Sequence, residues 1–199
     1  MDDNALILIV VIAILIIMSA YFSATETAFS SLNKIKLKNL AVNGSKRAES
    51  TLNLAKKFDS ILSTILIGNN IVNIASASIA TIVFTKYYGD AGVTISTIVM
   101  TIVVLIFGEI SPKSLSKESP EKFAMFSTPI LKVLLIIFTP LNFVFGLWKK
   151  TISKVIKVEE IPIEVEEELL TIVEEAEIKG GIDEHESKLI RSAIEFNDL

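Results

Sequence analysis

A single glutamate at the end of a long apolar stretch is the residue with the clearest chemical potential in this sequence. Glu109 follows Gly108, and Pro112 comes three residues later. A carboxylate at membrane depth is costly and usually serves a function. In a helix, Pro112 has no N–H for the carbonyl of Gly108, and its ring crowds that carbonyl. A freed carbonyl beside a carboxylate predicts a site for a hard cation, because Mg²⁺, Ca²⁺ and Na⁺ bind oxygen.

Two pairs of polar residues fall within the other long apolar stretches. Each pair has a spacing of four, which places both members on one face of a helix. Their hydroxyl and amide oxygens are ligands that Mg²⁺ or Na⁺ accepts. All these oxygens are expected at a similar depth, toward the cytoplasmic side. The predicted metal-binding residues are Ser19, Ser23, Asn69, Asn73, Gly108 and Glu109.

Each of these residues also has a purely structural interpretation. Serines and asparagines within spans can form hydrogen bonds between helices. Glu109 could form a salt bridge with Lys113, one turn further along a helix. Glu26 could pair with a basic surface helix or line an ion path, and we expect the structural role. The clusters taken together favour a cation site, although spacing alone does not name the ion.

Composition places the chain among integral membrane proteins and excludes several chemistries. Its 199 residues are 51% hydrophobic, with no cysteine and one histidine, His185. Thiolate and multi-histidine metal sites are therefore excluded. The basic residues flank apolar stretches, so nucleic acid is not an expected partner. No pairing of a nucleophile with a base is visible, and we do not expect an enzyme.

Three stretches are long and apolar enough to cross a bilayer: residues 5–22, 61–84 and 93–107. A cleaved signal peptide is the alternative for the first, but Asp2 and Asp3 stand where one would need basic residues. The lysine-rich segment 23–58 marks the cytoplasmic side, which puts the N-terminus outside. This segment is predicted to form two surface helices joined by a turn at Asn43–Ser45.

A fourth apolar stretch, residues 123–147, has two interpretations. It could cross the membrane, but the lysines after it would then lie outside, against the positive-inside rule. Pro129 and Pro140 also divide it into pieces too short to span singly. We favour a pair of re-entrant or interfacial helices on the inner side.

The last part of the chain is acidic and amphipathic. A helix is predicted from Pro162 to about Lys179, ended by Gly180 and Gly181. Asp183 and Glu186 have the spacing of a capping box for a second helix, residues 184–196. Such a hairpin is too small for its own core, so it should pack on a partner copy or on the membrane domain. His185 within it is expected to be a surface residue.

The predicted fold class is therefore an all-α membrane protein. Three transmembrane helices carry a juxtamembrane or re-entrant helical belt and a cytoplasmic acidic hairpin. The expected domains are a transmembrane domain over residues 1–157 and an acidic helical bundle over residues 158–199. We expect membrane lipid as a partner and a further domain after Leu199.

Three motifs in order resemble those of the CNNM/CorC magnesium transporters, and the similarity covers nearly the whole chain. They are FSATETAF at residues 22–29, IGNNIVN at 67–73 and GEISPK at 108–113. The resemblance implies a homodimer that holds a dehydrated Mg²⁺ at the inner side of the spans. It also implies CBS domains that bind ATP with Mg²⁺ in the full-length protein. The ligands it implies are Ser19, Ser23, Asn69, Gly108 and Glu109.

The family resemblance implies Mg²⁺ export, with Na⁺ exchange proposed as the driving force. The expected function is thus a Mg²⁺ transporter of the cell membrane, multi-pass, with its C-terminal region in the cytoplasm. The alternative is a membrane regulator that senses Mg²⁺ without transporting it and docks a partner. Neither the direction of transport nor the counter-ion follows from the residues.

Overall fold

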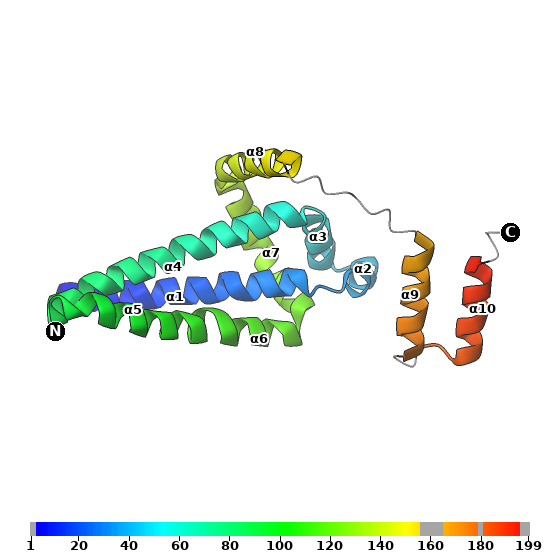
Figure 1. Ribbon diagram of the computed structural model, residues 1–199, viewed down its shortest axis with the longest axis horizontal. Coiled ribbons are helices and arrows are strands. Elements are labelled where there is room, and N and C mark those ends of the chain that lie inside the picture. The colour runs from blue at the N-terminus through cyan, green and yellow to red at the C-terminus, as the bar shows by residue number, and fades with distance from the viewer. Residues whose placement is uncertain (1–2, 156–164, 179–180, 196–199) are drawn as a thin grey trace. The chain divides into compact units, whose positions relative to one another are not determined.

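The computed structural model describes residues 3–155, 165–178 and 181–195, and the regular secondary structure in these ranges is helical. This confirms the all-α fold class. The chain divides into two compact units, Met1–Lys150 and Thr151–Leu199, and Figure 1 labels their helices. The helices are α1 (Asp3–Ser30), α2 (Lys34–Val42), α3 (Lys46–Ala55), α4 (Phe58–Tyr88), α5 (Ala91–Val103), the π-helix η1 (Val104–Ile110), α6 (Ser111–Glu118), α7 (Pro120–Ile137), α8 (Thr139–Val155), α9 (Val165–Ile178) and α10 (Glu184–Glu195).

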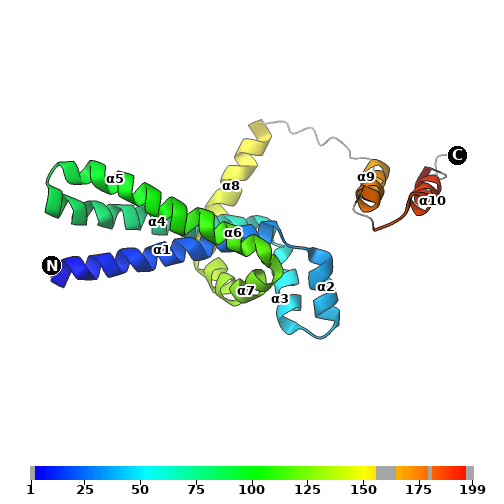
Figure 2. The same ribbon diagram turned by 90° about the horizontal axis from the view of Figure 1, so that it is seen from below.

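Three long helical segments form the centre of the first unit. Within the described residues, Asn4–Ser30, Phe58–Tyr88 and Ala91–Glu118 are long and apolar enough to cross a membrane. Figures 1 and 2 show them side by side. Much of their outer surface consists of exposed aliphatic side chains such as Ile17, Ile74 and Ile102. Burial of serine and threonine inside, with aliphatic groups outside, fits a multi-pass protein surrounded by lipid.

The first span is longer than predicted. The sequence suggested that it ends at Phe22, but α1 continues to Ser30. The extra turns contain no glycine or proline, and Ala24, Ala28 and Phe29 are buried in them. Tertiary packing thus prolongs the helix beyond the uncharged stretch.

The predicted surface helices are present as α2 and α3. Each begins at a side-chain cap, Asn33 for α2 and Ser45 for α3. The turn between them contains Gly44 with φ of 91°, a conformation that favours glycine. This confirms the two helices and their turn. Both lie where α1 ends and α4 begins (Figure 1).

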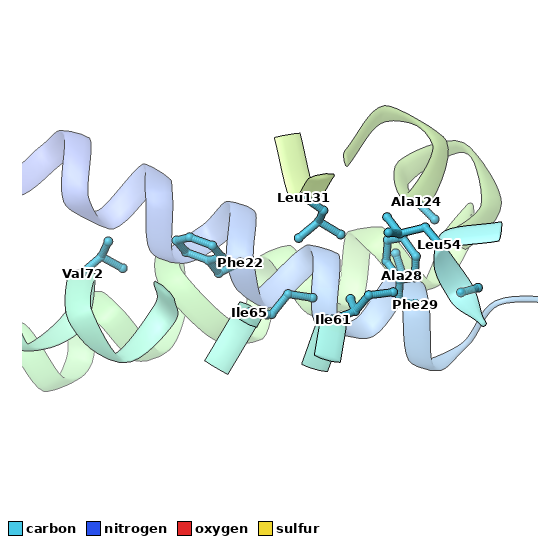
Figure 3. Packing of buried hydrophobic residues seen from close by; sticks show 10 residues of the cluster. Phe22, Ala28, Phe29, Leu54, Ile61, Ile65, Val72, Ala124 and Leu131 are labelled. Atoms are coloured by element: carbon cyan, nitrogen blue, oxygen red, sulfur yellow. The ribbon is translucent and has the colours of Figure 1, made fainter. Parts of the chain in front are cut away.

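A buried apolar cluster joins α3 and α7 to the spans α1 and α4. Figure 3 shows Phe22 and Phe29 of α1 in line with Ile61 and Ile65 of α4, with Leu131 of α7 above them. The ring of Phe22 lies directly over the backbone of α4. A Cβ at Gly68 would be 2.4 Å from its Cζ atom. Glycine at this position therefore allows the two spans to approach closely.

The third span contains a π-helical turn that the sequence analysis missed. The amide of Ser111 bonds the carbonyl of Ile106, an i→i+5 bond. Pro112 then lies at the start of α6, so the proline changes the helical register and does not break the helix. The last i→i+5 bond is that of Ser111, and α-helical spacing resumes in α6. The prediction, which assumed α-helical spacing, named the carbonyl of Gly108.

The apolar stretch after the third span forms a bent pair, α7 and α8. The two helices meet at a bend of 73°. The break lies at Phe138, shortly before Pro140, whereas Pro129 lies inside α7 without interrupting it. The prediction that Pro129 divides this apolar stretch is therefore wrong. By length and composition the pair can be a broken span or a re-entrant loop, so re-entry stays a prediction.

The second unit contains the acidic hairpin. The predicted capping box is confirmed, because the amide of Asp183 bonds Glu186 Oε2 at 3.0 Å and the amide of Glu186 bonds Asp183 Oδ1 at 2.8 Å. The hydroxyl of Ser187 donates to Glu177 Oε2 at 2.5 Å and joins α10 to α9. His185 is exposed, as expected. The predicted helix boundaries at Pro162, Lys179, Gly180 and Phe196 lie outside the described residues.

Candidate metal-binding site

A hydrogen bond between two of the spans defines the centre of the candidate site. The Ser19 hydroxyl on α1 donates to Asn69 Oδ1 on α4 at 3.0 Å. Ser19 is only 1% exposed, and Asn69 is half-buried. A buried hydroxyl bonded to an amide oxygen holds the two spans at a fixed register.

The third span reaches the same point through its π-helical turn. Gly108 lies in η1 and is buried. A Cβ added at this residue would be 2.9 Å from the Ser19 hydroxyl oxygen. The backbone of η1 therefore contacts the Ser19 side chain, and only glycine leaves space for it. Ser19, Asn69 and Gly108, predicted from three separate stretches, are brought together.

Two further predicted ligands have buried oxygens with no hydrogen-bond partner in the described part of the chain. They are Ser23 Oγ, on a fully buried side chain, and Asn73 Oδ1. Ser23 lies one turn after Ser19 on α1. The Asn73 amide group donates to Asn69 Oδ1 at 3.5 Å, which connects it with the centre of the site. Buried polar atoms are nearly always paired, so these oxygens have an unused capacity for a water or a cation.

The single carboxylate of the candidate site belongs to a residue of η1. Glu109 directly follows Gly108, and its side chain is half-buried. Lys113 Nζ forms an ion pair with Glu26 Oε2 at 3.2 Å. Among the described residues, no ion pair to Glu109 occurs. The alternative of a Glu109–Lys113 salt bridge is therefore wrong. Glu26 pairs with Lys113 of α6, and its expected structural role, as against lining an ion path, stays a prediction.

The donor set consists mainly of neutral oxygens. Within the described ranges, no group of three or more histidine, cysteine, aspartate or glutamate side chains could hold a metal ion. Zinc-type coordination is thus not supported there. Hydroxyl, amide and carboxylate oxygens suit Mg²⁺, Ca²⁺ or Na⁺.

A small groove of mixed polar and apolar lining, which the sequence analysis missed, lies between α4 and α5 and includes Asn73 of this site. It has a volume of about 230 Å³. The hydroxyl groups of Thr81 on α4 and Ser96 on α5 form a hydrogen bond across it, with 3.0 Å between their oxygens. The signal that could have indicated it is the i, i+4 pair Thr97 and Thr101 in the third span. The groove is lined by Asn73, Ala77, Thr81, Ser96, Thr97, Met100, Thr101 and Val104.

Comparison with known protein families gives a match over most of the chain. Residues 10–186 match the family described as the cyclin M transmembrane N-terminal domain. The chain belongs to the cyclin M (CNNM) family. This confirms the family resemblance that the three motifs indicated.

Among the relatives of this CNNM domain, one is named as an inner membrane protein and another as an export protein. A UPF0053 protein of Haemophilus influenzae is 39% identical over 92% of the chain, and the UPF0053 inner membrane protein YfjD of Escherichia coli is 35% identical over 91% of it. A polyamine export protein of Salmonella typhimurium is 24% identical over 94% of the chain. The match covers 44%, 43% and 45% of these relatives, respectively, so the chain spans less than half their length.

Proposed function

We propose that this CNNM domain carries Mg²⁺ across the membrane through a site formed by α1, α4 and η1. The observation that carries the proposal is the convergence of Ser19, Asn69 and Gly108 next to Glu109, with buried oxygens of Ser23 and Asn73 left without partners. The family match and relatives in the inner membrane support a role in membrane transport.

The chemistry of the site suits a small hard ion. Mg²⁺ requires about six oxygens at roughly 2.0–2.1 Å and gives up water reluctantly. Buried hydroxyl and amide oxygens would replace part of its hydration shell, and Glu109 would supply negative charge. The π-helical turn supports this role, because such turns often occur at functional sites. The proposal includes no enzymatic reaction.

The direction of transport is the second part of the proposal. Lysine-rich helices α2 and α3 at one end of the spans favour the cytoplasm on that side, with the N-terminus outside. The ion would enter from that side, and the groove between α4 and α5 would lead it toward the other. This corresponds to efflux, with Na⁺ as the counter-ion. We further propose that the chain works as a homodimer and that ATP–Mg²⁺ binds to CBS domains in the longer protein.

Polyamine export is the second candidate function. Relatives in Salmonella typhimurium and Escherichia coli that are 24% and 25% identical carry that name. A polyamine is also a cation that could donate hydrogen bonds to the same oxygens. The third candidate is a regulator that binds Mg²⁺ as a signal and does not transport it.

Flux in liposomes that contain the purified protein separates the three candidates. The transporter proposal predicts Mg²⁺ movement down its gradient, strongly reduced in the Glu109→Gln variant. Movement of radiolabelled putrescine without Mg²⁺ movement would favour polyamine export. Binding of Mg²⁺ without any flux would favour the regulator. Repeating the assay with and without a Na⁺ gradient tests the coupling.

A further inference from the structure

Two connected grooves lie between α3 and α7, outside the candidate metal-binding site. The first has a volume of about 600 Å³ and is lined by side chains from Lys46–Ser50 and Met125–Lys132. The second, of about 580 Å³, shares Lys46, Ser50 and Lys132 with it and continues along both helices. The two grooves therefore form one continuous surface, here called the belt groove.

The lining of the belt groove contains both basic and apolar side chains. Four basic residues line it: Lys46 and Arg47 on α3, Lys57 after α3, and Lys132 on α7. The apolar part of the lining comes mainly from α7, where Phe126 is 61% and Ile136 75% accessible. Exposed aliphatic and aromatic groups on a helix beside a bilayer are natural contacts for lipid chains.

The positive charge of the belt groove is largely uncompensated. Among the described residues, none of the four basic side chains forms an ion pair, and Lys132 donates to the neutral Ser50 Oγ at 2.6 Å. Glu49 is the acidic residue in the lining. Nearby acidic groups are used elsewhere, since Glu121 pairs with Lys36 at 2.9 Å. The groove thus combines a net positive charge with an apolar wall.

We infer that the belt groove binds an anionic phospholipid, with its phosphate near Arg47 and Lys132 and its acyl chains along the exposed face of α7. Basic pockets between helices at the membrane surface are suited to anionic headgroups. A second copy related by two-fold symmetry would bring its own basic residues to the same surface, where like charges repel. Free phosphate would leave the apolar wall exposed to water.

Native mass spectrometry of the full chain in a neutral detergent, with phosphatidylglycerol or phosphatidylcholine added, tests this inference. We expect phosphatidylglycerol to bind preferentially and to raise the melting temperature. The double variant Arg47→Gln, Lys132→Gln should weaken that binding by about fivefold for each basic side chain removed. The matched control removes two exposed α2 lysines outside the groove, Lys34→Gln and Lys38→Gln, and should bind as the wild type does.

Single variants and soluble anions separate lipid binding from misfolding and from simple charge attraction. If the double variant does not fold, Arg47→Gln alone replaces it, because that exposed side chain forms no hydrogen bond or ion pair among the described residues. Phe126→Ala should weaken phosphatidylglycerol binding while leaving any effect of inorganic phosphate unchanged. Equal binding of the two lipids, equal losses in the control variant, or equal stabilisation by inorganic phosphate or a soluble oligoglutamate peptide would overturn it.

Discussion

The Ser19 hydroxyl donates to Asn69 Oδ1 at 3.0 Å and joins the first two spans at the depth where the third span turns π-helical. The Ser19 oxygen also faces the third span, because it would lie 2.9 Å from a Cβ at Gly108. This geometry needs a small residue on the third span and a short side chain on the first.

Removing the amide of Asn69 should abolish the response to Mg²⁺. In Asn69→Ala the site loses an oxygen, and the buried Ser19 hydroxyl loses its acceptor, at a cost of about 1–3 kcal/mol. The melting temperature with and without Mg²⁺ measures both effects. The neighbouring Asn70 is exposed, so Asn70→Ala is the matched control and should respond to Mg²⁺ as the wild type does. Equal responses in both variants would argue against the assignment.

A methyl group at Gly108 should disturb the site from the backbone side. It would lie 2.9 Å from the Ser19 oxygen, and overpacking of this kind costs about 1–3 kcal/mol. Gly108→Ala should therefore lower the melting temperature and weaken Mg²⁺ stabilisation. Gly146 on α8 has open space around it, so Gly146→Ala is the control and should be neutral or slightly stabilising. Unchanged behaviour of Gly108→Ala would mean that the spans do not approach closely there.

Overpacking should also destabilise the protein at the contact of Phe22 with Gly68, between α1 and α4. In Gly68→Ala the new Cβ would lie 2.4 Å from the ring, which predicts a loss of about 1–3 kcal/mol. Adding Phe22→Leu should recover part of that loss, because the smaller side chain removes the clash. Thermal unfolding of the two single variants and the double variant measures the coupling. Strictly additive losses would contradict the packing in Figure 3.

The sequence indicated most of the fold because its strongest signals are local. Uncharged stretches predicted the spans, and the capping box of Asp183 and Glu186 predicted the start of α10. The candidate site was also accessible, because Ser19 and Asn69 are polar residues in apolar surroundings. Their convergence with Gly108 was expected from depth alone, and the structure adds the contact itself.

The features that the sequence analysis missed depend on register and tertiary packing. A proline predicts a disturbed helix, but only the structure distinguishes a break from the i→i+5 register of Ser111 with Ile106. Pro129 lies within α7, where tertiary contacts outweigh local preference. The extension of α1 to Ser30 likewise reflects burial of Ala28 and Phe29, which no periodicity along a single helix reveals.

The groove between α4 and α5 predicts a transport defect without a binding defect. The Thr101 hydroxyl lines that groove and donates to the carbonyl of Thr97. Thr101→Val keeps the shape and removes the oxygen, so Mg²⁺ flux should fall roughly fivefold, corresponding to about 1 kcal/mol. Mg²⁺ stabilisation should not change. The control is Thr94→Val, at an exposed position of α5 outside the groove, and equal flux in both variants would exclude this route.

The most direct test of the central claim is the Mg²⁺-dependent stabilisation of Glu109→Gln, which removes the charge and keeps the shape. At a Mg²⁺ concentration 100 times the dissociation constant, binding should stabilise the wild-type fold by about 2.7 kcal/mol. We predict that Glu109→Gln loses this stabilisation, while Glu118→Gln, an exposed glutamate on the same span, keeps it. Full Mg²⁺ stabilisation of Glu109→Gln would contradict a cation site at the π-helical turn.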